Sequence, residues 1–304
     1  MIRLSQVTRS ELSGILWMLT AGLCFVGVNG TVRWLGQDLP AAENAFIRFA
    51  FGLLFLIPVL WPALRQGFAP RVWALFTLRG ALHVVAVILW FYAMARIPVA
   101  EVTAIGFLNP IMVTLGAALL MGERISWRRG LAIGVALAGA MIVLRPGFRA
   151  LESGHFAQLG AALTFGSSYL VAKRLSELVP ATVVVAMMSL TVCVGLAPIA
   201  ALVWIQPTLV QYAVLACTAV FATAGHYAMT RAFVAAPLTV TQPITFLQLI
   251  WASLLGALAF GEPVEIWVLL GGAIMIGAIS YITWREARLR QRAITPLAGA
   301  TRES

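Results

Sequence analysis

Three basic side chains occupy positions where the neighbouring residues are almost entirely apolar. Arg48, Arg79 and His83 each lie inside a long hydrophobic run. A charged group within a membrane-length apolar helix is costly to bury, so such residues are functional candidates. A planar guanidinium suits a substrate carboxylate, and a histidine can contact a substrate or carry a proton. Arg48 and His83 therefore indicate a binding site for a polar small molecule within the membrane.

Each of the three could instead have a structural role. Arg48 could tie its helix to backbone carbonyls or to Glu43, and Asn44 lies one turn before it on the same helical face. Arg79 could extend to water at the nearer end of its helix, and His83 could be a neutral, hydrogen-bonded core residue. No Asp or Glu lies in the middle of a predicted span. We interpret this absence of a buried carboxylate as favouring facilitated transport over proton or sodium coupling.

A second group of candidates consists of aromatic and amide side chains near the middle of predicted spans. The rings would suit an aromatic or apolar substrate side chain, and the amides its polar groups, although any single ring could also face lipid. Gln242, Thr245 and Gln248 recur at three- to four-residue spacing and predict a polar stripe that faces a cavity. The complete predicted substrate site is Trp17, Asn44, Arg48, His83, Trp90, Phe107, Tyr169, Gln242, Thr245, Phe246, Gln248 and Trp251.

The composition places these residues in an integral membrane protein. Of the 304 residues, 61% are hydrophobic and 11% are charged, and the mean hydropathy is +0.94. Too little polar surface is available to cover a core in water. Since each crossing of the ~30 Å hydrocarbon layer takes ~20 residues, the chain has room for about ten helices. We expect an all-α protein with spans at 12–35, 42–61, 72–95, 99–121, 130–144, 156–175, 181–204, 209–230, 238–260 and 264–284, the fifth starting nearer Ser126.

Charge distribution predicts how these spans are oriented. Of the 21 Lys and Arg residues, fifteen fall in the loops of one side, four in those of the other, and two within spans. Because Lys and Arg prefer the cytoplasmic side, both termini are predicted to be cytoplasmic. This orientation explains the net charge of +10 without a nucleic-acid partner. The three cysteines and three histidines lack disulfide or metal-ligand spacing, so neither a metal nor another cofactor is expected.

The chain contains an internal duplication. Residues 98–123 recur as 237–262 at a shift of 139, and residues 14–40 recur as 154–180 at a shift of 140. Each half has five predicted spans, and because five is odd the second half enters the membrane from the opposite face. Inverted repeats are the usual basis of alternating access. We expect a first repeat at 12–146, a second at 154–286 and a basic cytoplasmic tail at 287–304.

Four prolines of the duplicated helices are predicted to act in gating: Pro98, Pro110, Pro237 and Pro243. Asn109-Pro110 aligns with Gln248-Leu249, so the nearest proline of the second copy lies earlier in its helix. The two helices should therefore bend at different depths. In the last helix of each half, Gly134 and Gly277 belong to small-residue series that predict close backbone packing.

These features resemble the EamA-type ten-helix carriers of the drug/metabolite transporter superfamily. The resemblance rests on the two five-helix halves, the Gly-Glu pairs at 122–123 and 261–262, Trp127-Arg128-Arg129 before a Gly-rich helix, and Arg48-Phe49. It implies a transporter of the bacterial inner membrane rather than an enzyme, with a central cavity lined by both halves. The chain looks most similar to exporters of aromatic and other neutral amino acids. Uptake of riboflavin or S-adenosylmethionine is the alternative. The implied partners are an amino-acid-like substrate and the lipid bilayer, and a monomer would suffice.

Overall fold

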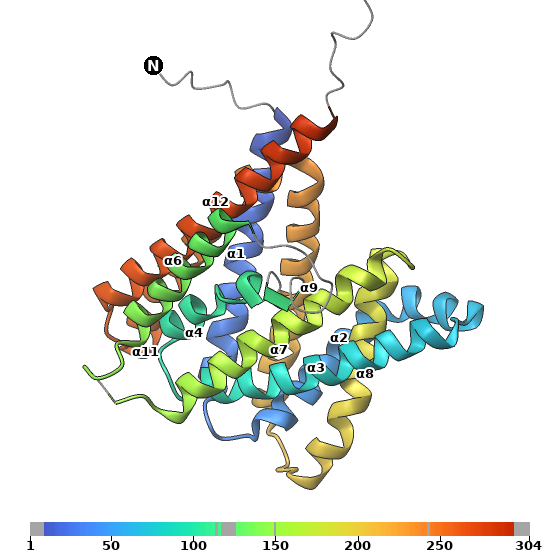
Figure 1. Ribbon diagram of the computed structural model, residues 1–304. Coiled ribbons are helices and arrows are strands. Elements are labelled where there is room, and N and C mark those ends of the chain that lie inside the picture. Colours follow the sequence, from blue (N-terminus) through green and yellow to red (C-terminus); the bar gives the residue numbers. More distant parts are fainter. Residues whose placement is uncertain (1–8, 113–114, 117–125, 149, 242–243, 295–304) are drawn as a thin grey trace, which may run out of the picture.

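The computed structural model describes residues 9–112, 115–116, 126–148, 150–241 and 244–294, and its elements in these ranges are α-helices (Figure 1). The first half contains α1 (Arg9–Leu35), α2 (Ala41–Gln66), α3 (Pro70–Met94), α4 (Val99–Gly106) and α6 (Trp127–Leu144). The second half contains α7 (Ser153–Ser176), α8 (Ala181–Leu202), α9 (Leu209–Ala235), α10 (Leu238–Thr241), α11 (Thr245–Phe260) and α12 (Ile266–Ile294).

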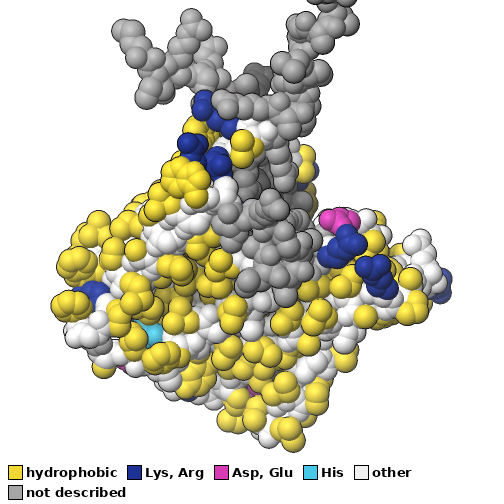
Figure 2. Space-filling view, viewed as in Figure 1, with side chains coloured by type: hydrophobic (Ala, Val, Ile, Leu, Met, Phe, Trp, Pro, Cys, Tyr) yellow, Lys and Arg dark blue, Asp and Glu magenta, His cyan; other side chains and the backbone are white. Residues whose placement is uncertain are grey.

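Length and composition make this a membrane fold. Within the described ranges, seven helices are long and apolar enough to cross a membrane, namely α1, α2, α3, α6, α8, α9 and α12. The outward side chains of the described helices are apolar too, with Leu202, Leu209 and Leu258 each at least 85% exposed. In Figure 2 hydrophobic side chains cover most of the visible face. An apolar surface of this extent suits contact with lipid, and the expected all-α membrane fold is confirmed.

Proline and glycine set several helix boundaries. Pro40, Pro98 and Pro180 each occupy the position just before a helix, where a fixed φ and a missing N–H favour a helix start. Gly261 follows α11 with a φ of 65°, a left-handed conformation that commonly ends helices. The fifth predicted span starts at Trp127, next to the expected Ser126.

Both copies of the duplicated helix are interrupted, but at different places. α4 ends at Gly106, a turn follows, and helical structure resumes at Asn109. In the second copy α10 ends at Thr241 and α11 begins at Thr245. Thr241 aligns with Val102, so the second break comes earlier along its helix. The prediction of unequal depths is confirmed, whereas Gln242 and Pro243 lie outside the described residues.

The helix packing has the symmetry of an inverted repeat. α1 packs on α9 as α7 packs on α3, while α2 pairs with α8 and α6 with α12. At the start of α1, Ser10 Oγ donates to Ala235 O at 2.6 Å, just before α10. At its end, Arg33 Nη1 donates to Met94 O at 3.0 Å, just before α4. The two copies thus begin at opposite ends of one helix, which we name the α1-start face and the α1-end face. The pair Gly122-Glu123 lies outside the described residues.

The pairing of α6 and α12 corrects one residue assignment. A Cβ added to Gly139 would lie 2.8 Å from Gly271 O, and one added to Gly271 would lie 2.5 Å from Gly139 O. Nothing lies within 4 Å of a Cβ added to Gly134 or Gly277. The prediction of close packing at Gly134 and Gly277 is wrong, because these helices meet along the neighbouring face that contains Gly139 and Gly271.

Candidate substrate-binding site

His83 lies at a junction of three helices from both halves. It is 7% exposed, and its Nδ1 is 3.2 Å from Ser168 Oγ on α7. The ring of Phe165, one turn before Ser168, meets the imidazole edge-to-face at a centroid distance of 5.0 Å. The ring of Phe49 on α2 also meets the imidazole edge-to-face, at a centroid distance of 6.1 Å. We call His83, Phe49, Phe165 and Ser168 the His83 cluster. The sequence-based site contained only His83 of these four.

Arg79, one turn before His83, is fixed by the protein itself. It is 5% exposed, and its Nη1 donates a 2.8 Å hydrogen bond to Val184 O of α8. The expectation that Arg79 extends to water is therefore wrong, because α8 packs over α3 there and supplies a carbonyl. Its backbone carbonyl also lies 3.5 Å from Ser168 Oγ, so Arg79 supports the His83 cluster.

Arg48 is the membrane-embedded cation that the described part of the chain leaves without a polar partner. Its Cζ lies 4.2 Å from the centroid of the Phe49 ring, a cation–π contact that joins it to the His83 cluster. No hydrogen bond or ion pair joins its guanidinium to any described residue. Glu43 does not reach it, since the Glu43 carboxylate accepts a 2.9 Å hydrogen bond from Ile205 N. The alternative that Glu43 ties down Arg48 is wrong.

Two carboxylates are buried, although neither lies in the middle of a helix. Glu43 is fully buried and Glu101 is 2% exposed. Both lie in the first turn of a helix, where the helix dipole stabilises negative charge. Glu101 Oε2 lies 2.7 Å from His155 Nε2, and Glu152 N donates to His155 Nδ1 at 3.0 Å. Because neither carboxylate lies in the middle of a predicted span, facilitated transport stays a prediction.

The other aromatic candidates divide among several places. Tyr169 stacks on Phe165 at 6.2 Å and extends the His83 cluster. Trp17 lies apart, between Tyr227 of α9 at 6.0 Å and the Arg231 guanidinium at 5.4 Å. Three further candidates pack against the main hydrophobic core: Trp90, Phe107 and Phe246.

Helix α11 contributes less to this site than its polar stripe suggests. Gln248 faces α1, where a Cβ on Gly22 would lie 3.9 Å from its Cβ. Thr245 is half-buried, and Trp251 is 38% exposed. Pro98 and Pro237 precede α4 and α10, and Pro110 follows the break after α4, so their gating role remains a prediction.

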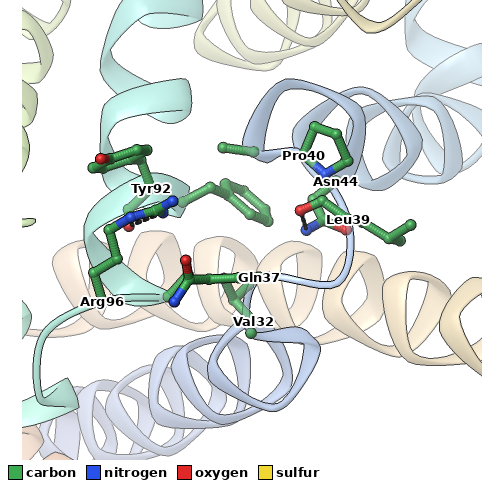
Figure 3. Close-up of a pocket in the computed structure, with 11 residues that line it drawn as sticks. Val32, Gln37, Leu39, Pro40, Asn44, Tyr92 and Arg96 are labelled. Atoms are coloured by element: carbon green, nitrogen blue, oxygen red, sulfur yellow. Dashed lines mark hydrogen bonds between the residues drawn. The ribbon is translucent and has the colours of Figure 1, made fainter. Parts of the chain in front are cut away.

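Asn44 lies apart from the His83 cluster, in a pocket near the α1-end face with a volume of about 250 Å³ (Figure 3). Its Nδ2 donates to Leu39 O at 3.2 Å. Across the pocket, the Arg96 guanidinium stacks on the Tyr92 ring at 3.5 Å. This pocket contains none of the residues of the His83 cluster.

Comparison with known proteins decides the class of this protein. The sequence matches the EamA-like transporter family over residues 12–145 and 152–284. The chain belongs to the EamA-like transporter family. It is thus a multi-pass transporter of the bacterial inner membrane, built on the ten-helix plan of that family.

Curated relatives cover almost the whole chain. A riboflavin transporter of Rhizobium johnstonii is 29% identical, covering 92% of this chain and 93% of its own length. An S-adenosylmethionine uptake transporter of Rickettsia prowazekii is 25% identical, with coverages of 94% and 97%. A pseudopaline exporter of Pseudomonas aeruginosa is 25% identical, with coverages of 88% and 94%. A solved crystal structure with a TM-score of 0.58 and 18% identity covers 94% of this chain and 99% of its own, and shows the same fold.

Proposed function

We propose that this transporter carries a small metabolite with a planar ring and a hydrogen-bond acceptor or anionic group, by alternating access. The observation that carries the proposal is the Arg48 guanidinium, which has an aromatic neighbour but no hydrogen-bond or ion-pair partner among the described residues. Guanidinium N–H groups need acceptors when they are withdrawn from water. A ligand is the natural source of those acceptors.

The surroundings of Arg48 support a ring-bearing ligand. Phe49, Phe165 and Tyr169 provide aromatic faces and edges beside the polar His83 and Ser168. Ligand sites typically combine a mostly apolar lining with a few placed polar groups. Because α2 and α3 come from one half and α7 from the other, the cluster also lies where inverted repeats usually bind substrate.

Among ring-bearing metabolites, we place uptake of a riboflavin-like heteroaromatic compound first. Two of the relatives are named for riboflavin and for S-adenosylmethionine uptake. Riboflavin has a flat ring system with carbonyl acceptors, which suits the arginine and the aromatic cluster together. Export of aromatic and other neutral amino acids is the second candidate, because a free guanidinium also matches a carboxylate.

A counterflow assay in proteoliposomes tests both candidates. The labelled panel contains riboflavin, S-adenosylmethionine, phenylalanine and tryptophan, and the variants are Arg48→Ala and Arg65→Ala. Arg65 is the matched control, since it lies on the same helix but stacks on Trp61 near the helix end. We expect exchange of riboflavin that Arg48→Ala abolishes and Arg65→Ala retains. Exchange of amino acids alone would favour the second candidate, and no exchange of any compound would contradict both.

A further inference from the structure

Glu262 joins three helices at the α1-end face. Its Oε1 lies 2.8 Å from Arg33 Nη2 at the end of α1, and its Oε2 accepts a 2.9 Å hydrogen bond from Val99 N at the start of α4. Glu262 itself follows the end of α11, and Arg33 also donates to Met94 O at the end of α3. We call this set of contacts between Arg33, Glu262, Val99 and Met94 the clasp.

The backbone around Glu262 directs its carboxylate into the clasp. Gly261 adopts a left-handed φ of 65°, which turns the chain back over the end of α11. Glu262 N then donates to Gly256 O at 3.0 Å. A Cβ on Gly256 would lie 2.5 Å from Glu262 Oε2, so only glycine leaves room for the carboxylate there. The carboxylate position is therefore built into the helix end.

The clasp is held by charge as well as by geometry. The side chains of Arg33 and Glu262 are only 20% and 8% exposed, so water screens their attraction weakly. Hydrogen bonds to ionised groups are about twice as strong as neutral ones. The start of α4 also carries the positive end of a helix dipole, which favours the Glu262 carboxylate. Loss of one partner of such a buried pair is strongly unfavourable.

A second layer of contacts lies one turn further into the protein. Asn29, four residues before Arg33, donates from Nδ2 to Thr103 Oγ1 at 3.2 Å, and Thr103 lies four residues after Val99. The His83 cluster is deeper still, since His83 precedes Met94 by eleven residues, or about 16 Å along α3. The clasp and the Asn29–Thr103 contact thus form two layers between the α1-end face and the depth of the His83 cluster.

We propose that the clasp is the lock that keeps the α1-end face closed in this conformation and that must break in each transport cycle. α4 and α11, which it holds together, are the two interrupted helices, so they are suited to change shape. The inference rests on the proposed alternating access. It does not depend on the substrate, and its test contains none, so its failure leaves the substrate proposal standing.

Cysteine labelling from one side of the membrane tests the lock. In a background with Cys24, Cys193 and Cys217 replaced by alanine, Thr103→Cys reports on the seam between α1 and α4. A membrane-impermeant maleimide is added to one side of sealed vesicles. A separate Phe148→Cys protein identifies the correct side, because it reacts only when the maleimide reaches the α1-end face. Phe148, 89% exposed and just beyond α6, marks the α1-end face.

Two substitutions separate the contributions of charge and hydrogen bonding. Glu262→Gln keeps an oxygen that can accept from Val99 N but removes the charge, and Glu262→Ala removes both. The matched control is Glu265→Gln, because Glu265 pairs with Arg145 near the same face but joins α6 to α12. We expect the rate of labelling at Thr103→Cys to rise from the parent to Glu262→Gln and again to Glu262→Ala. The rate in Glu262→Ala should exceed that of the parent by about tenfold or more, which corresponds to about 1.4 kcal/mol.

The control should stay within about twofold of the parent, since a partly exposed ion pair contributes little. Equal labelling rates across the Glu262 series would overturn the proposal, as would an equal acceleration in Glu265→Gln. If Glu262→Ala fails to fold, Arg33→Lys and Arg33→Gln decide instead. Arg33→Lys retains the positive charge and must label more slowly than Arg33→Gln, and the reverse order would contradict the lock.

Discussion

Arg79 and Arg48 differ in what surrounds their guanidinium groups. Arg79 donates to the carbonyl of Val184 and so connects α3 to α8. Arg48 has an aromatic contact but no polar partner among the described residues, although burial of an unpaired charge is costly. The same residue type is thus tied to a backbone carbonyl in one helix and placed against an aromatic ring in another. His83 lies one turn from Arg79 and shares Phe49 with Arg48.

The neighbouring serines of α7 provide a test at this scale. Ser168 is fully buried against His83, whereas Ser167 is half-buried and donates within its own helix to Leu163 O. Ser168→Ala should lower the free energy of unfolding by about 1–3 kcal/mol, because it leaves a buried ring nitrogen without its partner. It should also weaken substrate binding, while Ser167→Ala changes neither. Thermal unfolding in detergent and a binding isotherm give the two values, and equal behaviour of the serines would refute the assignment.

At this scale the sequence predicted charged residues better than aromatic ones. Arg48 and His83 stand out because ionisable groups are rare in apolar helices. Phe49, Phe165 and Ser168 do not, since the chain has 16 Phe residues and their identity does not reveal which rings meet. That depends on how each helix is rotated against its neighbours, which only tertiary packing sets. A serine pair inside the apolar run of α7 was the one signal available for Ser168.

The sequence predicted correctly that both duplicated helices, which contain α4 and α11, are interrupted. From Pro110 in one copy and an earlier proline in the other, the sequence predicted breaks at unequal depths. The first helical segments of the two copies do end at different aligned positions, Gly106 and Thr241. Helix–helix contacts were predicted less well. The small-residue series marked α6 and α12 as closely packed helices, but it named glycines one face away from the contact. Spacing alone leaves the rotation of such a helix undetermined, because small residues occur on more than one side.

The glycines of α6 and α12 therefore give a test at the level of elements. Gly139→Ala would bring a methyl group to 2.8 Å from Gly271 O, so the backbones must separate. We expect a loss of about 1–3 kcal/mol in the free energy of unfolding, the usual cost of overpacking. Gly134→Ala, on the same helix with nothing within 4 Å of the added Cβ, is the control. Thermal denaturation of the two variants in one detergent gives the comparison, and equal stabilities would show that the helices do not meet at Gly139.

On the scale of the whole molecule, the start of α1 and the end of α12 lie at the same end in the view of Figure 1. Arg285 of α12 donates to Ser126 Oγ, at the start of α6, at 2.9 Å. α12 continues as one helix to Ile294, so the part of the basic tail that the structure describes is helical. We propose that this end faces the cytoplasm, because the excess of Lys and Arg lies there.

Labelling of intact cells tests that orientation. Phe148→Cys, between α6 and α7, should react with an impermeant maleimide added outside the cells. Leu178→Cys, between α7 and α8 and 46% exposed, should react only after the cells are permeabilised. Both positions are exposed, so they differ chiefly in the side of the membrane. The opposite pattern would reverse the assignment and would place the clasp at the cytoplasmic side.

With Arg48 in the proposed substrate site, the transport cycle should be sensitive to membrane voltage. It begins the third turn of α2, about 10 Å into the membrane, and arginine stays protonated there. A site that opens alternately to each side carries this charge through part of the electric field whenever it reorients empty. A full elementary charge moved through 100 mV changes the energy by about 2.3 kcal/mol. A bound monoanion would cancel that charge, so voltage would drive only the empty return step, whereas with neutral riboflavin it would act on both steps.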